Sequence, residues 1–280
     1  MTANMKSSNI NVQLRELPWR LRILTFESLY RAGSGHVGPC LSMAEILTCL
    51  FFSAMNIDRN DKSRDRFILS KGHGVPILYS VFSELGWIKK NELNSLRQID
   101  SRLQGHPDKI ALEYLDSGSG ALGQGISISI GFALAQTMQK NNGCSFCIVG
   151  DGEMQEGQIW ESILFAGVKK IKNLCVIVDN NKFQNETSVS ETLGEISLEM
   201  KIKSFGWEYI SIDGHSLEEI LDAIEIFKKN DSPTLIDAHT IKGKGVDFME
   251  NNNSWHSKVL TEDDYINAKN QCQRKIDDLN

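Results

Sequence analysis

Two short apolar runs, each ending in a polar cluster, most constrain how this chain can fold. The first run covers residues 145–149 and ends at Gly150-Asp151-Gly152; the second covers residues 174–178 and ends at Asp179-Asn180-Asn181. A helical stretch separates them, which predicts a βαβ unit with parallel strands and a right-handed crossover. Both clusters should therefore lie at the carboxyl ends of strands, where open α/β sheets bind ligands.

The residue types in these clusters point to a hard cation. Asp151 offers a carboxylate and Asn181 an amide oxygen, a pair that suits Mg²⁺ completed by water and phosphate oxygens better than it suits zinc. The glycines on both sides of Asp151 allow a phosphate to approach the backbone. The pattern predicts a metal–diphosphate site.

The bulk composition excludes little but sets limits. With 280 residues, 41% of them hydrophobic and 24% charged, the chain suits one large or two small soluble α/β domains. A net charge of −6, without a basic cluster interleaved with aromatics, argues against a nucleic-acid partner. The polar N-terminus lacks a signal-peptide core, and the apolar stretch 46–55 is too short to cross a bilayer. We expect a cytosolic protein with no membrane partner.

The six cysteines are expected to be plain core residues. Cys144 and Cys147 have redox or zinc spacing, but they fall in a predicted strand, whose alternation would point the two thiols to opposite faces. No second pair is present to complete a zinc site.

The alternation of strands and helices predicts a doubly wound parallel sheet with helices on both faces. We expect a flexible tail at residues 1–11 and one domain at 12–280. Ser42 should cap the second helix, with Glu45 completing a capping box, and the small residues of the helix 125–140 predict that it is buried at a subunit interface. Loops are expected at 32–39, 71–74, 104–107, 116–123 and 241–246. Further strands are expected at 65–70, 207–212 and 233–241, and helices at 12–31 (firm from about Pro18), 43–55, 76–85, 91–99, 125–140, 197–205, 217–229 and 263–279.

Two glycine patterns of the form G-x-G-x-x-G, at 33–38 and 118–123, invite a dinucleotide-binding interpretation. The first follows a helix, and the second follows no convincing strand and lacks the expected acidic residue downstream. Both fail the required context, which argues against a nicotinamide dehydrogenase, and a P-loop motif is absent.

Four of the six histidines lie in glycine-flanked or polar loops. His36, His73 and His106 each follow a glycine, and His256 lies in a polar loop near the C-terminus. A single loop histidine is often just exposed, but four together predict a shared polar pocket. His215 and His239 are interpreted as structural. Two acids at the start of the next helix, Glu156 and Glu161, could simply complement its dipole, but Glu156 is close to the metal cluster.

These motifs together resemble the transketolase family of thiamine diphosphate enzymes. The pattern Gly-Asp-Gly followed by Asn-Asn is similar to the thiamine diphosphate motif, and the resemblance spans about residues 12–260 in family order. The segments that carry it are SGHVGPCLS (34–42), RDRFILSKGHGVPILYS (64–80), LQGHPD (103–108), GSGALGQGIS (118–127), GDGEMQEGQIWE (150–161), VDNNKF (178–183) and IKGKGVDFMENNNSWH (241–256).

The resemblance implies a role for each site residue. The metal, Mg²⁺ or Ca²⁺, would be held by Asp151, Asn181 and the backbone carbonyl of Phe183. The cofactor, thiamine diphosphate, would contact Gly150, Gly152, Glu153, His73 and the loop Gly120-Ala121-Leu122. His36, His106 and His256 would bind ketose hydroxyls and help to move protons, and Glu156 would join an acidic network coupling paired active sites. Many relatives have Gly-Pro-Leu where this chain has Gly120-Ala121-Leu122, a change that removes no chemical group.

The resemblance also implies a partner. Complete transketolases continue into a pyrimidine-binding domain and a C-terminal domain, which supply the activating glutamate and groups that grip the substrate phosphate. We therefore expect the N-terminal subunit of a split transketolase, in an α2β2 assembly with a C-terminal subunit, that transfers a two-carbon ketol unit between sugar phosphates. Four alternatives stay open: a split enzyme of a specialised pathway with an unusual acceptor, the alpha subunit of a 2-oxo acid dehydrogenase, a deoxyxylulose phosphate synthase, and a non-catalytic cofactor-binding paralogue.

Overall fold

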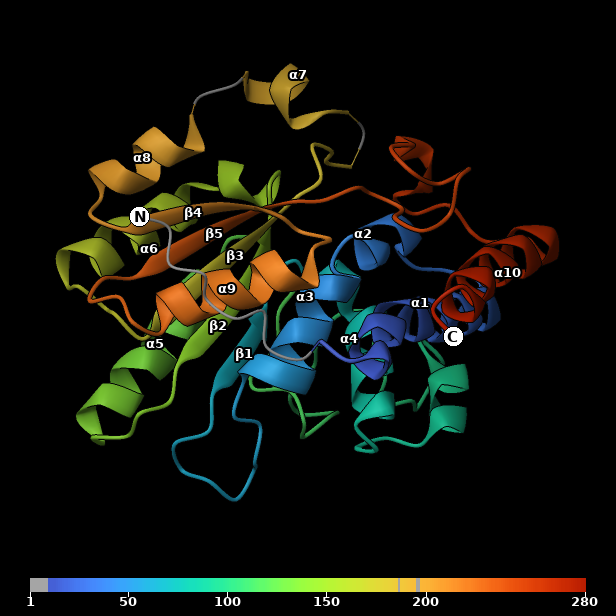
Figure 1. Ribbon diagram of the computed structural model, residues 1–280, viewed down its shortest axis with the longest axis horizontal. Helices are drawn as coiled ribbons and strands as arrows, with labels where there is room; N and C mark the ends of the chain where they lie inside the picture. Colours follow the sequence, from blue (N-terminus) through green and yellow to red (C-terminus); the bar gives the residue numbers. More distant parts are fainter. Residues whose placement is uncertain (1–9, 186, 195–196) are drawn as a thin grey trace.

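One five-stranded parallel sheet forms the centre of the molecule. The computed structural model describes residues 10–185, 187–194 and 197–280, and its strands lie in the order β1-β2-β3-β5-β4 (Figure 1). The strands are β1 (Arg66–Leu69), β2 (Ser145–Gly150), β3 (Leu174–Asn180), β4 (Glu208–Asp213) and β5 (Thr234–His239). Strands β2 and β3 pair in parallel, with helix α6 (Gly157–Val168) between them in sequence. The predicted βαβ unit is confirmed.

The register of β2 and β3 brings the two polar clusters together. Gly150 pairs with Asp179 at the carboxyl end of the two strands. Asp151 and Asn181 each follow the end of their strand and therefore leave the sheet at the same edge, as the sequence predicts.

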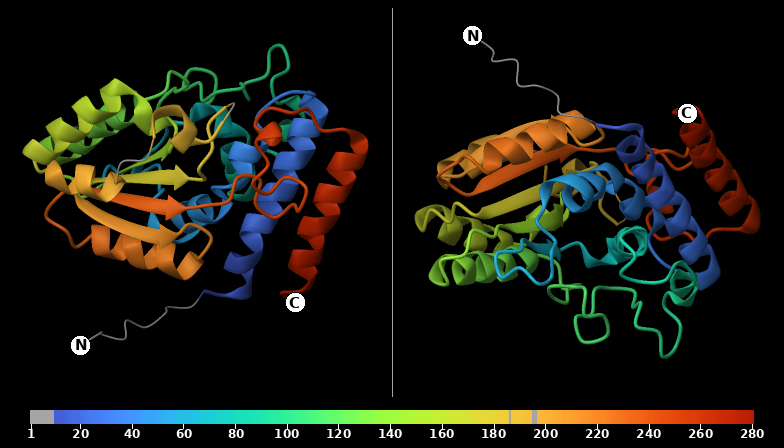
Figure 2. Two further views of the ribbon diagram at one scale, coloured as in Figure 1. Left: turned by 90° about the horizontal axis from the view of Figure 1, so that it is seen from above. Right: turned by 60° about the horizontal axis from the view of Figure 1, so that its bottom comes forward.

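Helices cover both faces of the sheet, which confirms the doubly wound class. One face packs Phe146 and Ile148 against one core, and the other packs Cys147 and Val149 against a second core. Figure 2 shows α5 (Gly125–Met138) and α6 on one side and α9 (Leu217–Phe227) on the other. Because both faces are covered, the central strands read as unbroken apolar runs. The remaining helices are α1 (Val12–Ala32), α2 (Val37–Leu41), α3 (Ala44–Cys49), α4 (Val75–Glu84), α7 (Val189–Leu193), α8 (Leu198–Ser204) and α10 (Glu262–Asp277).

The terminal helices α1 and α10 lie side by side (Figure 2). Short 3₁₀ turns complete the described chain at η2 (Gly72–Gly74), η3 (Lys90–Ser95), η4 (Glu153–Gln155) and η5 (Asn253–Trp255). The helix α7 was not predicted; Ser188 caps it in a capping box with Glu191. Helix α5 buries one face, including Ile126, Ser129 and Ala133, and leaves Met138 exposed.

The cysteine prediction is confirmed. All six thiols are free, and all except the half-buried Cys144 are buried. Cys144 packs against the core on one face of the sheet and Cys147 belongs to the core on the other face, as strand alternation requires.

The predicted capping box at Ser42 is wrong. The chain forms α2, then α3, then a π-helical turn η1 (Leu50–Ala54), instead of one helix from 43 to 55. Ser42 makes no capping bond; its hydroxyl donates to Asp179, 2.6 Å away. Glu45 instead accepts two hydrogen bonds from the buried Arg22. Long-range partners have displaced a local cap.

Three further expectations are revised. Helix α1 begins at Val12, as predicted, with the Asn11 side chain as its cap, but it is already regular before Pro18, which lies inside it. The predicted helix at 91–99 does not form: the short η3 turn ends at Ser95, and Arg97 has a positive φ that a helix does not allow. The expected loop at 32–39 ends early, because α2 starts at Val37. Of the predicted flexible tail, residues 1–9 lie outside the described part.

Among the described residues, none of the helices combines the length and the apolar character needed to span a bilayer.

Candidate active site

Asp151 is a buried carboxylate held by the backbone. Its Oδ1 accepts a hydrogen bond from the Gly152 N–H at 2.8 Å, and its Oδ2 accepts one from the Lys182 N–H at 2.5 Å. Burial and the nearby Asp179 carboxylate raise the pKa of Asp151 to about 7. A bound cation would offset the cost of burying this charge.

Asn181 is held with its amide in one orientation. Its Nδ2 donates to Asp179 Oδ2 at 3.4 Å, and its Oδ1 accepts from the Phe183 N–H at 3.1 Å. An amide oxygen has two lone pairs, so Oδ1 keeps one for a further partner. Two oxygen donors on adjacent strand ends, one of them anionic, fit a hard cation, so these residues match the metal site that the sequence predicts.

Three of the four loop histidines form one group. The ring centroids of His36 and His73 are 5.1 Å apart, those of His36 and His256 are 5.3 Å apart, and those of His73 and His256 are 5.4 Å apart. His106 is exposed and lies beside Gly120, where an added Cβ would be 3.2 Å from the imidazole ring. The fold thus brings three of the four histidines together from segments far apart in sequence.

The pKa of each of the four imidazoles is lowered, which favours the neutral form. Burial and Arg97 lower the pKa of His36 to about 4, and burial and Lys242 lower the pKa of His256 to about 3. Burial, with Lys71, brings the pKa of His73 well below its usual value, and the partial burial of the otherwise exposed His106, with Arg97, also lowers its pKa. Within the described part of the chain, the buried Nδ1 of His36 has no hydrogen-bond partner. Such an unpaired polar atom in a group of neutral donors fits a polar ligand.

Glu153 fixes the loop that contains Gly120, Ala121 and Leu122. Its Oε1 accepts from the Gly123 N–H at 2.8 Å and its Oε2 from the Gly150 N–H at 3.0 Å. The Ser70 hydroxyl donates to the same carboxylate. The loop is also held at Leu122, whose carbonyl accepts from Gln158. Glu153 therefore ties this loop to the end of β2.

Glu156 is exposed at the N-cap of α6 and lies next to Gly123. His215 is structural, as predicted, because its two ring nitrogens bond Glu45 and the Ile241 N–H. His239, about half exposed, bonds Ser211.

Sequence reasoning missed Lys242, which lies in the loop after β5. It is almost fully buried, and its Nζ contacts Asn253 Oδ1 at 2.5 Å, His256 Nδ1 at 2.8 Å and the Gln184 carbonyl at 3.2 Å. Burial and the neighbouring Lys71 lower the pKa of Lys242 to about 8. A lysine between a strand end and a glycine, at the edge where ligands bind, is a signal that could have found it.

The buried ion pair between Lys71 and Asp179 was missed as well. Lys71 lies in the loop after β1 and Asp179 near the end of β3, and neither side chain is more than 2% exposed. In the sequence, Asp179 was noted only as the first residue of the cluster Asp179-Asn180-Asn181, and no ion pair was predicted for it.

An open parallel sheet with two oxygen ligands and a histidine group at its carboxyl edge fits a cofactor-binding α/β domain. Residues 15–275 match the family model described as the transketolase, thiamine diphosphate binding domain. The chain belongs to the transketolase family.

The similar proteins fall into two groups. The transketolase of Mus musculus is 40% identical over 95% of this chain, which spans only 42% of that relative. In contrast, the 6-deoxy-6-sulfo-D-fructose transketolase subunit SqwG of Clostridium sp. (strain MSTE9) is 40% identical, with 87% of this chain and 90% of the relative covered. An apulose-4-phosphate transketolase subunit of Phocaeicola vulgatus is 35% identical, with 90% and 91% covered.

A solved structure shows the same fold. The transketolase of Campylobacter jejuni superposes with a TM-score of 0.87 at 31% identity, covering 96% of this chain and 46% of that one.

Proposed function

We propose that this chain is the diphosphate-binding subunit of a two-component, thiamine diphosphate-dependent transketolase. With a second subunit it would transfer a two-carbon ketol unit from a ketose phosphate to an aldose. The observation that carries the proposal is the meeting of Asp151 and Asn181 at adjacent strand ends in a domain that also assembles a group of neutral histidines.

The metal and the diphosphate would be held by groups already in place. Asp151, Asn181 and the Phe183 carbonyl would hold Mg²⁺ or Ca²⁺. Gly152 would receive the diphosphate at the backbone. Cationic Lys242 and neutral His73 would balance and hydrogen-bond its charge, since a lysine is a point-charge phosphate ligand. Bound thiamine diphosphate supplies a nucleophilic carbon and an electron sink for carbon–carbon cleavage.

The histidines would handle the substrate protons. A neutral imidazole donates from one ring nitrogen and accepts at the other, so His36, His106 and His256 can bind ketose hydroxyls and exchange protons with them. Lys242 bonds Nδ1 of His256 at 2.8 Å, which leaves Nε2 protonated and available to a hydroxyl. On His36, the nitrogen available to a substrate hydroxyl would be Nδ1, which has no hydrogen-bond partner among the described residues.

Two glutamates complete the site in different ways. Glu153 would act on the cofactor through the loop at Gly120, Ala121 and Leu122, which it holds against β2. Glu156, exposed at the start of α6, would reach the acidic network that couples paired active sites in the assembled enzyme.

A partner chain is supported by the two relatives named as subunits, which this chain matches over about nine tenths of their length. We propose a C-terminal subunit with the pyrimidine-binding domain, in an α2β2 assembly. The test is ketol transfer from xylulose 5-phosphate to ribose 5-phosphate by the purified chain alone and by the co-expressed pair. Activity only in the pair, at a sedimentation mass of two copies of each, is expected. Full activity of the single chain would refute the two-component proposal.

The same two relatives favour a specialised substrate as a second candidate. One is named for a sulfonated sugar and the other for apulose 4-phosphate. Turnover of a panel of ketose donors and aldose acceptors by the pair would decide between central and specialised substrates. His36→Ala in the pair tests catalysis itself: unchanged turnover would favour a non-catalytic scaffold.

A further inference from the structure

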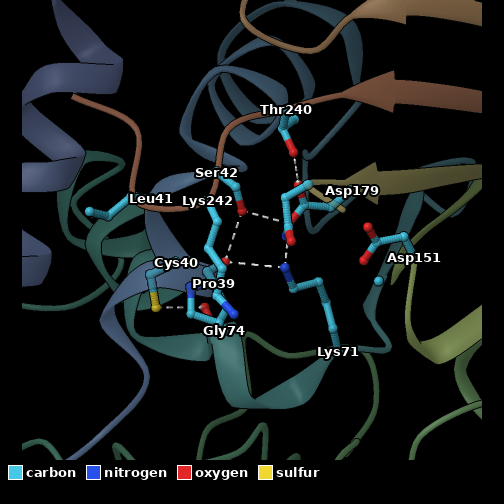
Figure 3. Close-up of polar contacts among 12 residues, drawn as sticks. Pro39, Cys40, Leu41, Ser42, Lys71, Gly74, Asp151, Asp179, Thr240 and Lys242 are labelled. Atoms are coloured by element: carbon cyan, nitrogen blue, oxygen red, sulfur yellow. Dashed lines mark hydrogen bonds and ion pairs between the residues drawn. The ribbon is translucent and has the colours of Figure 1, made fainter. Parts of the chain in front are cut away.

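Asp179 is a fully buried carboxylate that accepts hydrogen bonds from three other segments and from its own. Ser42 Oγ donates to its Oδ2 at 2.6 Å, and Lys71 Nζ and Thr240 Oγ1 donate to its two oxygens (Figure 3). The fourth donor is the Asn181 amide, at 3.4 Å. The donors belong to the α2–α3 junction and to the ends of β1, β5 and β3, so Asp179 joins the segments that surround the site.

The ammonium of Lys71 neutralises this charge. It pairs with Asp179 and donates a second bond to the Pro39 carbonyl at 3.2 Å. An unpaired carboxylate this deep in the protein would be strongly unfavourable. Because Lys71 neutralises Asp179, this second carboxylate can lie near Asp151 without leaving an uncompensated negative charge inside the protein.

What Asp179 does for the site follows from the Asn181 amide. An amide has a donor end and an acceptor end of nearly the same shape, so its orientation depends on its neighbours. Here the acceptor Asp179 faces Nδ2 and the Phe183 N–H faces Oδ1. The flipped amide would set oxygen against carboxylate and NH₂ against N–H, two repulsive contacts.

We propose that Asp179 is a positioning residue for the cation site: it orients the Asn181 amide so that the oxygen, and not the NH₂ group, faces the metal, with Lys71 as its internal counter-charge. The inference rests on the proposed function, since it requires that Asn181 is a metal ligand. Groups that orient metal ligands typically contribute about 10- to 100-fold to metal affinity.

The test is Mn²⁺ binding, because Mn²⁺ prefers the same oxygen ligands as Mg²⁺. The purified full chain is titrated with Mn²⁺ in the presence of thiamine diphosphate, free Mn²⁺ is measured by electron paramagnetic resonance, and folding is checked by circular dichroism. Asp179→Asn should bind Mn²⁺ about 10- to 100-fold more weakly than the wild type.

The chain contains a matched control for a purely structural effect. Asp237 is also a buried carboxylate near a strand end, and it accepts from the Asn180 amide at 2.7 Å and from Tyr209 at 2.7 Å. Asp237→Asn should lose stability as Asp179→Asn does, but keep wild-type Mn²⁺ affinity.

A rescue variant separates orientation from stability. A carboxylate at 181 presents oxygen in either orientation, so Asp179→Asn combined with Asn181→Asp should regain most of the lost affinity. In the wild-type background, Asn181→Asp should instead weaken binding, because it faces the Asp179 carboxylate. If Asp179→Asn does not fold, the double variant Lys71→Met with Asp179→Asn removes both buried charges together. Its Mn²⁺ affinity is then compared with that of the triple variant that also carries Asn181→Asp.

Three results are decisive. Weaker binding by Asp179→Asn with rescue by Asn181→Asp supports the inference. Wild-type affinity in Asp179→Asn, or no rescue in the folded double variants, overturns the inference but leaves the proposed function standing. Equal binding by the wild type and Asp151→Asn shows that the metal site itself is absent, which overturns the proposed function together with the inference.

Discussion

Replacing Glu45 with glutamine should strongly destabilise the fold. Its carboxylate accepts two bonds of 2.8 Å from the guanidinium of Arg22, which is completely buried, and a third of 3.0 Å from Nδ1 of His215. Arg22 comes from α1, Glu45 from α3, and His215 from the turn between β4 and α9. The substitution keeps the shape of the side chain but leaves a buried guanidinium without its counter-charge.

Two independent estimates agree on how much free energy of unfolding this substitution should remove. Removing one partner of a buried ion pair typically costs about 3–5 kcal/mol. Burial alone would raise the pKa of Glu45, but Arg22 and then His215 outweigh it and lower the pKa from 4.5 to about 2, a shift worth about 3 kcal/mol. Because the folded pKa is depressed, this stability is fully present above about pH 4.5 and is lost as the pH falls through about 2.

The assay is urea unfolding at pH 7, followed by tryptophan fluorescence and circular dichroism. Glu218→Gln is the matched control, because it breaks the exposed pair between Arg15 and Glu218, whose side chains are 45% and 41% accessible. We expect a loss of about 3 kcal/mol for Glu45→Gln and less than about 1 kcal/mol for the control.

A loss for Glu45→Gln no larger than that of the control would refute this reasoning. The double variant Arg22→Met with Glu45→Met gives a second check, since replacing both charges leaves no unpaired ion. It should be more stable than Glu45→Gln.

Three further predictions concern stability and reactivity. Burial and Lys242 lower the pKa of His256 from 6.5 to about 3. As the pH drops below about 6.5, the unfolded chain therefore binds a proton at this position before the folded chain does, and stability falls. Between pH 7 and pH 5, the urea midpoint of His256→Gln should decrease less than the wild-type midpoint. Gly167→Ala should cost about 1–3 kcal/mol, because its Cβ would lie 1.9 Å from the Phe205 carbonyl oxygen. Gly131→Ala in α5, with nothing within 4 Å of its Cβ, should be neutral or gain about 0.5–1 kcal/mol, and urea midpoints that reverse this order would contradict the packing argument. Of the six thiols, the half-buried Cys144 should react first with Ellman's reagent in the native protein, and only slowly, because burial raises the pKa of its thiol to about 12; rapid reaction of several thiols would contradict their burial.

The sequence alone determined the sheet, its two covered faces and the strand ends that carry Asp151 and Asn181. These follow from local patterns: apolar runs of strand length, a helical period between them, and polar residues where each run stops. The loop histidines could be singled out in the same way, because glycine marks the turns that contain them.

Tertiary structure alone decided the partners of the buried polar residues Ser42, Glu45, Lys71 and Lys242. Ser42 and Glu45 match a capping box in sequence, yet Ser42 bonds Asp179 and Glu45 bonds Arg22. A cap contributes about 1 kcal/mol, whereas leaving a buried charge unpaired costs about 3–5 kcal/mol, so the long-range partners prevail. Lys71 and Lys242 were missed for the same reason: a lysine in a glycine loop looks solvated until the fold buries it. Lys71 is paired with Asp179 of β3, whereas Lys242 is buried against partners from other loops, among them His256.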